Sequence, residues 1–158
     1  MVNASSGWLR NSDGVQELVG EQVADTRLLF PLFMNLRLRE QYSHMRVSSI
    51  DTIDGRAVYV INATRPDGKD ERLYFELESG LLVRRTSYTR TIIGIIPQQN
   101  DFEDYRDVEG VKFPFIVRTA TIDARNPIIV RKFDEIRLNI PIDESKLKMP
   151  VVSKPVNR

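Results

Sequence analysis

The stretch MRVSSIDTIDGRAVYVI, residues 45–61, decides how most of this chain folds. In this stretch Asp54-Gly55 separates the run Met45–Ile53 from a second apolar run at residues 57–61. An Asp-Gly pair between two such runs predicts a β-hairpin, because Asp and Gly tolerate the positive φ angles that a two-residue turn requires. We therefore expect two antiparallel strands joined by a tight turn.

Turn signals of the same kind recur along the rest of the chain. They are Pro66-Asp67-Gly68, Glu78-Ser79-Gly80, Glu109-Gly110 and Asn126-Pro127. The runs that they bound are Glu71–Leu77, Leu81–Ile93, Asp101–Val108, Val111–Ile122 and Ile128–Leu138. Strands linked by consecutive hairpins form an antiparallel sheet, so the sequence predicts a meander of about seven strands.

Side-chain alternation predicts which face of this sheet is covered. In residues 72–77, Leu73, Phe75 and Leu77 alternate with polar or charged neighbours, and residues 111–118 repeat the pattern. Because successive side chains of a strand point to opposite faces, one face is expected to be apolar and the other largely charged. Such a sheet is typically covered on one side only.

The cover is expected from residues 21–42, where apolar residues follow helical spacing. Pro31 suits the first turn of a helix but not its interior, so we predict a short helix at Glu21–Phe30 and a second that starts at Pro31. The predicted fold class is α+β, with a strongly twisted antiparallel half-barrel wrapped around one or two helices. We expect one domain over residues 1–150 and an extended C-terminal tail at residues 151–158.

Composition excludes several functional classes. The 158 residues include 23 Lys and Arg against 22 Asp and Glu, and a net charge of +1 argues against a nucleic-acid partner. Because the chain has no cysteine, a thiol nucleophile, a Cys-ligated zinc and an iron–sulfur cluster are ruled out. We predict no metal and no cofactor. The opening residues do not resemble a signal peptide, and no run is apolar enough to span a membrane.

Three stretches together resemble a known family: Arg72–Phe75, Ser79–Arg85 and Asp101–Pro114. They are similar to the LolA/LolB-like superfamily of bacterial outer-membrane lipoprotein-sorting proteins. The resemblance extends to uncharacterised bacterial relatives in which this domain is the C-terminal part of a longer exported protein. It implies an incomplete antiparallel barrel around helices, an apolar cavity for acyl chains, and a location in the periplasm or cell envelope.

The function predicted from this resemblance is non-enzymatic binding of a lipid-like or other apolar ligand between sheet and helices. The resemblance also implies lipoprotein or lipid carriage and contact with a membrane surface. The side chains expected to line the cavity are Leu29, Phe30, Phe33, Met34, Ile93 and Ile95. A second interpretation is that Leu28, Leu29, Leu32, Phe33 and Leu36 fill the core completely, with Phe30 and Met34 also part of it, and that Thr91–Pro97 is a buried strand end. The chain would then be a structural or interaction domain that docks another part of a longer parent chain.

The charged residues allow two interpretations as well. Arg84, Arg85 and Arg90 are candidates for an anionic headgroup, but arginines on strands more often pair with carboxylates across the sheet. The acidic residues of 101–109 have the oxygen ligands for Ca²⁺ or the paired carboxylates of a glycosidase, yet they lack calcium-loop spacing and fit a solvated strand.

Two further residues are singled out by their rarity. His44 is the only histidine and has no acidic neighbour in sequence, which favours a surface role. Trp8, the only tryptophan, is expected in a first short strand, where it closes one end of the core or stacks on a ligand. We name no catalytic residue and predict that the chain is not an enzyme.

Overall fold

The computed structural model describes residues 7–11, 14–20, 22–23, 38–91, 94–121, 128–141, 143 and 148–149. The chain divides into two compact units. One unit combines Met1–Phe33 with Asn139–Arg158, and the other is Met34–Leu138. Nothing described here tests the predicted domain boundary at residue 150, which stays a prediction.

The first unit contains a hairpin. Strand β1 (Gly7–Asn11) pairs in antiparallel fashion with β2 (Gly14–Leu18). Trp8 lies in β1 opposite Glu17, as expected of a first short strand. Its predicted place at one end of the core stays a prediction.

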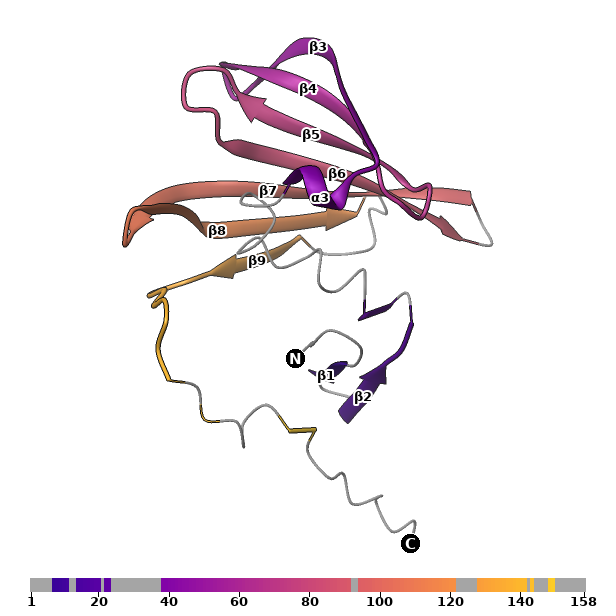
Figure 1. The fold of residues 1–158 in the computed structure, drawn as a ribbon, viewed down its shortest axis with the longest axis vertical. Coiled ribbons are helices and arrows are strands. Elements are labelled where there is room, and N and C mark those ends of the chain that lie inside the picture. Colours follow the sequence, from indigo (N-terminus) through magenta and orange to yellow (C-terminus); the bar gives the residue numbers. More distant parts are fainter. Residues whose placement is uncertain are drawn as a thin grey trace, which may run out of the picture. The chain divides into compact units, whose positions relative to one another are not determined.

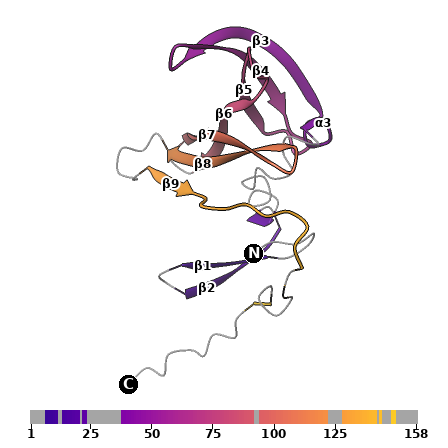
Figure 2. The same cartoon turned by 90° about the vertical axis from the view of Figure 1, so that its left-hand side faces the viewer.

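The second unit is built on one sheet of seven antiparallel strands whose order across the sheet follows the order of the chain (Figure 1). Seen from the side, the sheet curls between β9 and β3 (Figure 2). The predicted meander is therefore confirmed, whereas closure into a half-barrel stays a prediction. The strands are β3 (His44–Ile53), β4 (Arg56–Thr64), β5 (Asp70–Glu76), β6 (Leu82–Thr91), β7 (Gly94–Val108), β8 (Val111–Thr121) and β9 (Ile129–Lys132).

The tight turns form where the sequence predicts them. Asp54 and Gly55 have φ angles of 48° and 78°, and Glu109 and Gly110 have 52° and 85°. Two successive positive φ angles are the signature of the turn that matches the twist of a hairpin. Two strand bounds differ most from the prediction. Strand β7 begins at Gly94 because its pairing with β6 is unbroken up to Thr91, and β9 ends at Lys132, before a bend at Asp134.

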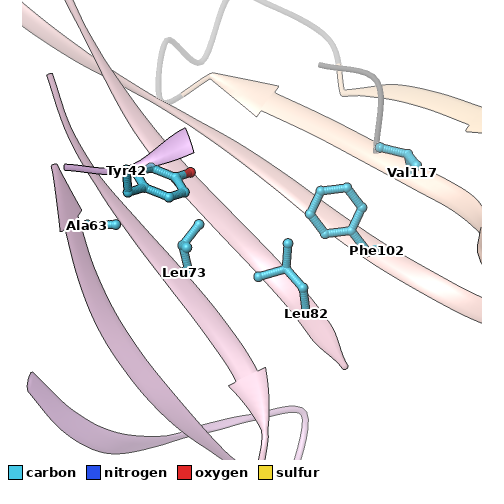
Figure 3. Packing of buried hydrophobic residues seen from close by; sticks show 6 residues of the cluster. All are labelled: Tyr42, Ala63, Leu73, Leu82, Phe102 and Val117. Atoms are coloured by element: carbon cyan, nitrogen blue, oxygen red, sulfur yellow. The ribbon is translucent and has the colours of Figure 1, made fainter. Parts of the chain in front are cut away.

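The main core lies on the face of the sheet that bears Leu73. Side chains from five strands and from the residue after helix α3 (Leu38–Gln41) pack together there (Figure 3). Leu73 has no exposed surface and Leu82 almost none. The buried members of this core are Tyr42, Ala63, Leu73, Leu82, Phe102 and Val117.

The opposite face is less polar than expected. Ile53, Val58 and Val83 are buried there in a second cluster, against which Tyr74 packs. The prediction of a sheet with one apolar face was therefore wrong for β3–β6. Strand pairing explains the difference, since Val60 lies opposite Tyr74 on this face and apolar side chains that face each other across neighbouring strands cover one another. Leu77, predicted to belong to the core face, lies beyond the end of β5 and is exposed.

The predicted helices fall largely outside the described residues. A helical turn is described at Gln22–Val23, and α3 covers four residues near the end of the predicted segment. Residues 24–37, which hold Pro31, are not described. Wrapping of the sheet around one or two helices is therefore still a prediction.

Candidate functional site

Three large apolar side chains of β3 and β4 are exposed on the core face of the sheet, next to the buried cluster. Val47 is 56% exposed, Ile50 63% and Tyr59 42%. Residues directly opposite each other on neighbouring strands share a face, and Val47 lies opposite Ile61, which lies opposite Leu73. Ile50 likewise lies opposite Tyr59, which lies opposite Phe75. We call Val47, Ile50 and Tyr59 the apolar patch.

A β-bulge brings two members of this patch onto one face. Val47 and Ile50 are three positions apart and would lie on opposite faces of a regular strand. The register of β3 against β4 shifts between Val47 and Ser49, and the hydroxyl of Ser48 donates to the carbonyl oxygen of Val60 at 3.0 Å. An extra residue in one strand is what lets positions three apart share a face.

Beside the apolar cluster, a buried ion pair crosses the same face. Arg85 donates to Glu71 through Nε at 2.8 Å and through Nη2 at 2.5 Å, and both side chains are buried. The Tyr42 hydroxyl donates to Glu71 Oε2 at 2.6 Å, and Arg65 Nη1 lies 4.0 Å from Oε1. Burial, and then the Glu71 carboxylate, raise the pKa of Tyr42 well above its ordinary value. These hydrogen bonds link Tyr42, the residue after α3, to β5 and β6.

Two of the predicted headgroup arginines, Arg84 and Arg85, lie on opposite faces of the sheet. Arg84 donates to Asp101 at 2.5 Å, on the face opposite that of Arg85. Arg85 pairs with Glu71 as described above, and the side chain of Arg90 is outside the described part of the chain. The two described arginines therefore form the cross-strand ion pairs that the second interpretation expects.

Four of the five acidic residues of 101–109 lie close to cationic side chains, and one of the four is Asp101, the partner of Arg84. Glu103 accepts from Arg118 at 2.7 Å, and Asp104 accepts from Arg106 at 2.6 Å, a hydrogen bond that lowers the pKa of Asp104. Asp107 lies 3.7 Å from Lys112 Nζ. Among the residues that the structure describes, no three metal-ligating side chains gather. His44 is exposed at the start of β3.

An open groove of about 800 Å³ lies at the β4–β5 turn. Its lining includes Ile95, which is 60% exposed, so the expectation of a buried strand end was wrong for this residue. The other lining residues are mostly polar or charged: Asn62, Asp67, Gly68, Lys69, Asp70, Glu71, Arg72 and Tyr88.

The remaining predicted ligand-binding residues, Leu29, Phe30, Phe33, Met34 and Ile93, lie outside the described residues. Sequence analysis also missed the apolar patch. No local pattern in the sequence could have found it, because Val47 and Ile50 would lie on opposite faces of a regular strand and only the bulge places them on one face.

Comparison with solved structures decides the fold. No family model matches the sequence, and no curated protein matches it. A LolA superfamily protein from Nitrosomonas europaea superposes on 69% of this chain with a TM-score of 0.52 and 14% sequence identity. The chain has a LolA-type fold. The superposition covers 50% of that neighbour, so this chain spans about half of the neighbour's length. Within the described part of the chain, no helix is long and apolar enough to cross a membrane.

Proposed function

We propose that this chain binds an acyl chain or similar apolar ligand on the core face of its sheet, without catalysis. The observation that carries the proposal is the apolar patch, which exposes Val47, Ile50 and Tyr59 beside the buried core. Exposed apolar surface that continues from a core marks a binding site, because covering it removes it from water. Burial contributes about 25 cal/mol for each Å² of apolar surface.

The proposal includes the predicted helical residues. Leu29, Phe30, Phe33 and Met34 would supply the opposite wall of the site, as the resemblance implies. The LolA-type fold supports this arrangement. On the same basis we place the protein in the periplasm or cell envelope, where it would carry a lipid or lipoprotein.

The test is binding of a dansylated fatty acid to the purified chain. We expect binding by the unmodified protein and about tenfold weaker binding by Ile50→Asp, because a carboxylate in the patch must lose its hydration when the ligand covers it. Ile128→Asp is the matched control, since Ile128 is also 63% exposed but lies outside the patch. Circular dichroism verifies that both variants keep the sheet.

Each outcome points to one function. Native mass spectrometry with lipid extraction would reveal an acyl species that purifies with the chain. If no lipid purifies with it and the probe does not bind, the proposal fails, and the patch is then covered by protein, as expected of an interaction domain with a filled core. Equal loss in both variants would mean that binding does not use the patch.

A further inference from the structure

Strand β3 forms one edge of the sheet. It is the first strand in the sheet order, ten residues long, and within the described residues it pairs with β4 alone (Figure 1). A strand with an open edge presents unpaired backbone N–H and C=O groups that another strand can bind. The sequence of β3 indicates which strand fits.

The middle of β3 is self-complementary when it is placed against an antiparallel copy of itself. The six central residues are Arg46, Val47, Ser48, Ser49, Ile50 and Asp51. About a centre between the two serines, Ser48 lies opposite Ser49, Val47 opposite Ile50, and Arg46 opposite Asp51. Serine thus meets serine, apolar meets apolar, and cation meets anion.

Because of the bulge, Val47 and Ile50 lie on one face of β3, and Arg46 and Asp51 lie on the other. Val47 and Ile50 both lie on the core face, as their partners in β4 establish. Arg46 lies opposite Asn62 and Asp51 opposite Val58, two β4 residues that share the other face. In a regular strand, positions five apart would lie on opposite faces, so Arg46 and Asp51 could not face each other in this register.

We propose that two copies of this chain dimerise through β3, in antiparallel register, about a two-fold axis between Ser48 and Ser49. Arg46 of each copy then forms an ion pair with the partner's Asp51, so the dimer holds this pair twice. A two-fold interface requires a self-complementary surface, and β3 has one. The two sheets join edge to edge into one continuous sheet.

The charges and the bulge favour a second copy over another partner. Arg46 and Asp51 are exposed and form no ion pair with any residue in the described ranges. A bulge usually protects an edge against pairing with a regular strand. Beyond the bulge, core-face residues of β3 would lie opposite residues on the other face of such a strand. Only a strand with the same bulge keeps core-face residues opposite core-face residues both before and after the bulge. The inference does not rest on the proposed ligand, because edge pairing leaves the core face uncovered.

The test is sedimentation velocity of the full chain over a dilution series, with charge-reversed variants. We expect Arg46→Asp and Asp51→Arg each to raise the dimer dissociation constant about tenfold, because like charges then face each other twice. The double variant restores the opposite charges in exchanged positions and should recover the dimer. Arg72→Asp is the control, because Arg72 is exposed on inner strand β5 and has no ion pair among described residues.

The results separate this proposal from the alternatives. A monomer at every concentration overturns it, as does a dimer that both single variants leave intact. If the single variants weaken the dimer but the double variant fails to recover it while keeping its circular dichroism, the register is wrong. Fatty-acid binding is measured on the same variants, so failure of the ligand proposal is detected separately.

Discussion

At the scale of single residues, the least expected feature is the charge that is buried between β5 and β6. Glu71 and Arg85 lie away from water and are joined by two hydrogen bonds, and Tyr42 adds a third hydrogen bond to the carboxylate. Burying an ion pair costs desolvation free energy that good geometry offsets only in part, but removing one partner leaves the other charge uncompensated. The ion pair therefore limits which substitutions are tolerated at Glu71 and at Arg85.

We predict that Glu71→Gln lowers the free energy of unfolding by about 3–5 kcal/mol, because Arg85 stays buried without a counter-charge. The double variant Glu71→Leu with Arg85→Met should recover most of this loss, since it removes both charges. Urea denaturation followed by circular dichroism measures both effects. Asp104→Asn is the control, because its ion pair with Arg106 is exposed to solvent and exposed ion pairs contribute little to stability. Equal losses in Glu71→Gln and Asp104→Asn would contradict the prediction.

The raised pKa of Tyr42 predicts that the stability of the folded chain depends on pH. Its pKa is raised in the folded chain, chiefly by burial and then by Glu71, whereas in the unfolded chain it has the ordinary value of 10.0. Above pH 10 the unfolded chain releases this proton more readily, so the stability that Tyr42 contributes is full below pH 10 and falls as the pH rises.

The measurement compares the free energy of unfolding of the unmodified chain and Tyr42→Phe between about pH 8 and 11. The difference between them should narrow as the pH rises, because phenylalanine has no proton to lose. A constant difference across this range would show that Tyr42 titrates alike in both states.

At the scale of elements, the hairpin turns hold the meander in register. Asp54 and Gly55 both have positive φ, and no atom lies within 4 Å of where a Cβ on Gly55 would stand. A substitution at Gly55 is therefore costly through its backbone conformation and not through a clash.

We predict that Gly55→Ala lowers the free energy of unfolding by about 1–2 kcal/mol, the cost of a left-handed conformation for a residue with a Cβ. Asp54→Gly should change it by less, since glycine accepts the same φ while aspartate tolerates it. Thermal unfolding of the two variants provides the comparison. A Gly55→Ala variant as stable as the parent would imply that the turn can adopt another type.

At the scale of the whole molecule, both described core clusters lie within one unit. Every side chain of the two clusters belongs to Met34–Leu138. The buried Glu71–Arg85 pair and the apolar patch also lie within these limits. The described core of the sheet therefore consists of side chains from one continuous segment, residues 34–138.

We predict that residues 34–138 expressed alone fold into the same sheet and unfold cooperatively in urea, because they contain these clusters. Far-UV circular dichroism and urea denaturation test this. Leu29, Phe30 and Phe33 are outside the fragment, so weaker fatty-acid binding by the folded fragment would support their place in the ligand site. A fragment without cooperative unfolding would show that the core needs residues 1–33 or 139–158.

The sequence by itself determined the meander. Asp54-Gly55, Glu109-Gly110 and the alternation around Leu73 each predict structure within a few residues, and local backbone conformation is what specifies a turn or a strand. The resemblance that pointed to a LolA-type fold depended on the same turn and strand features, and the structural comparison agrees with it.

Only the tertiary structure decided which side chains meet. Glu71 and Arg85 are 14 positions apart and face each other because of the β5–β6 register, and the bulge at Ser48 moves Val47 and Ile50 onto one face. Register and curvature depend on every strand of the sheet at once, so no local pattern specifies them. The buried ion pair, the second apolar cluster and the exposed patch follow from these long-range pairings.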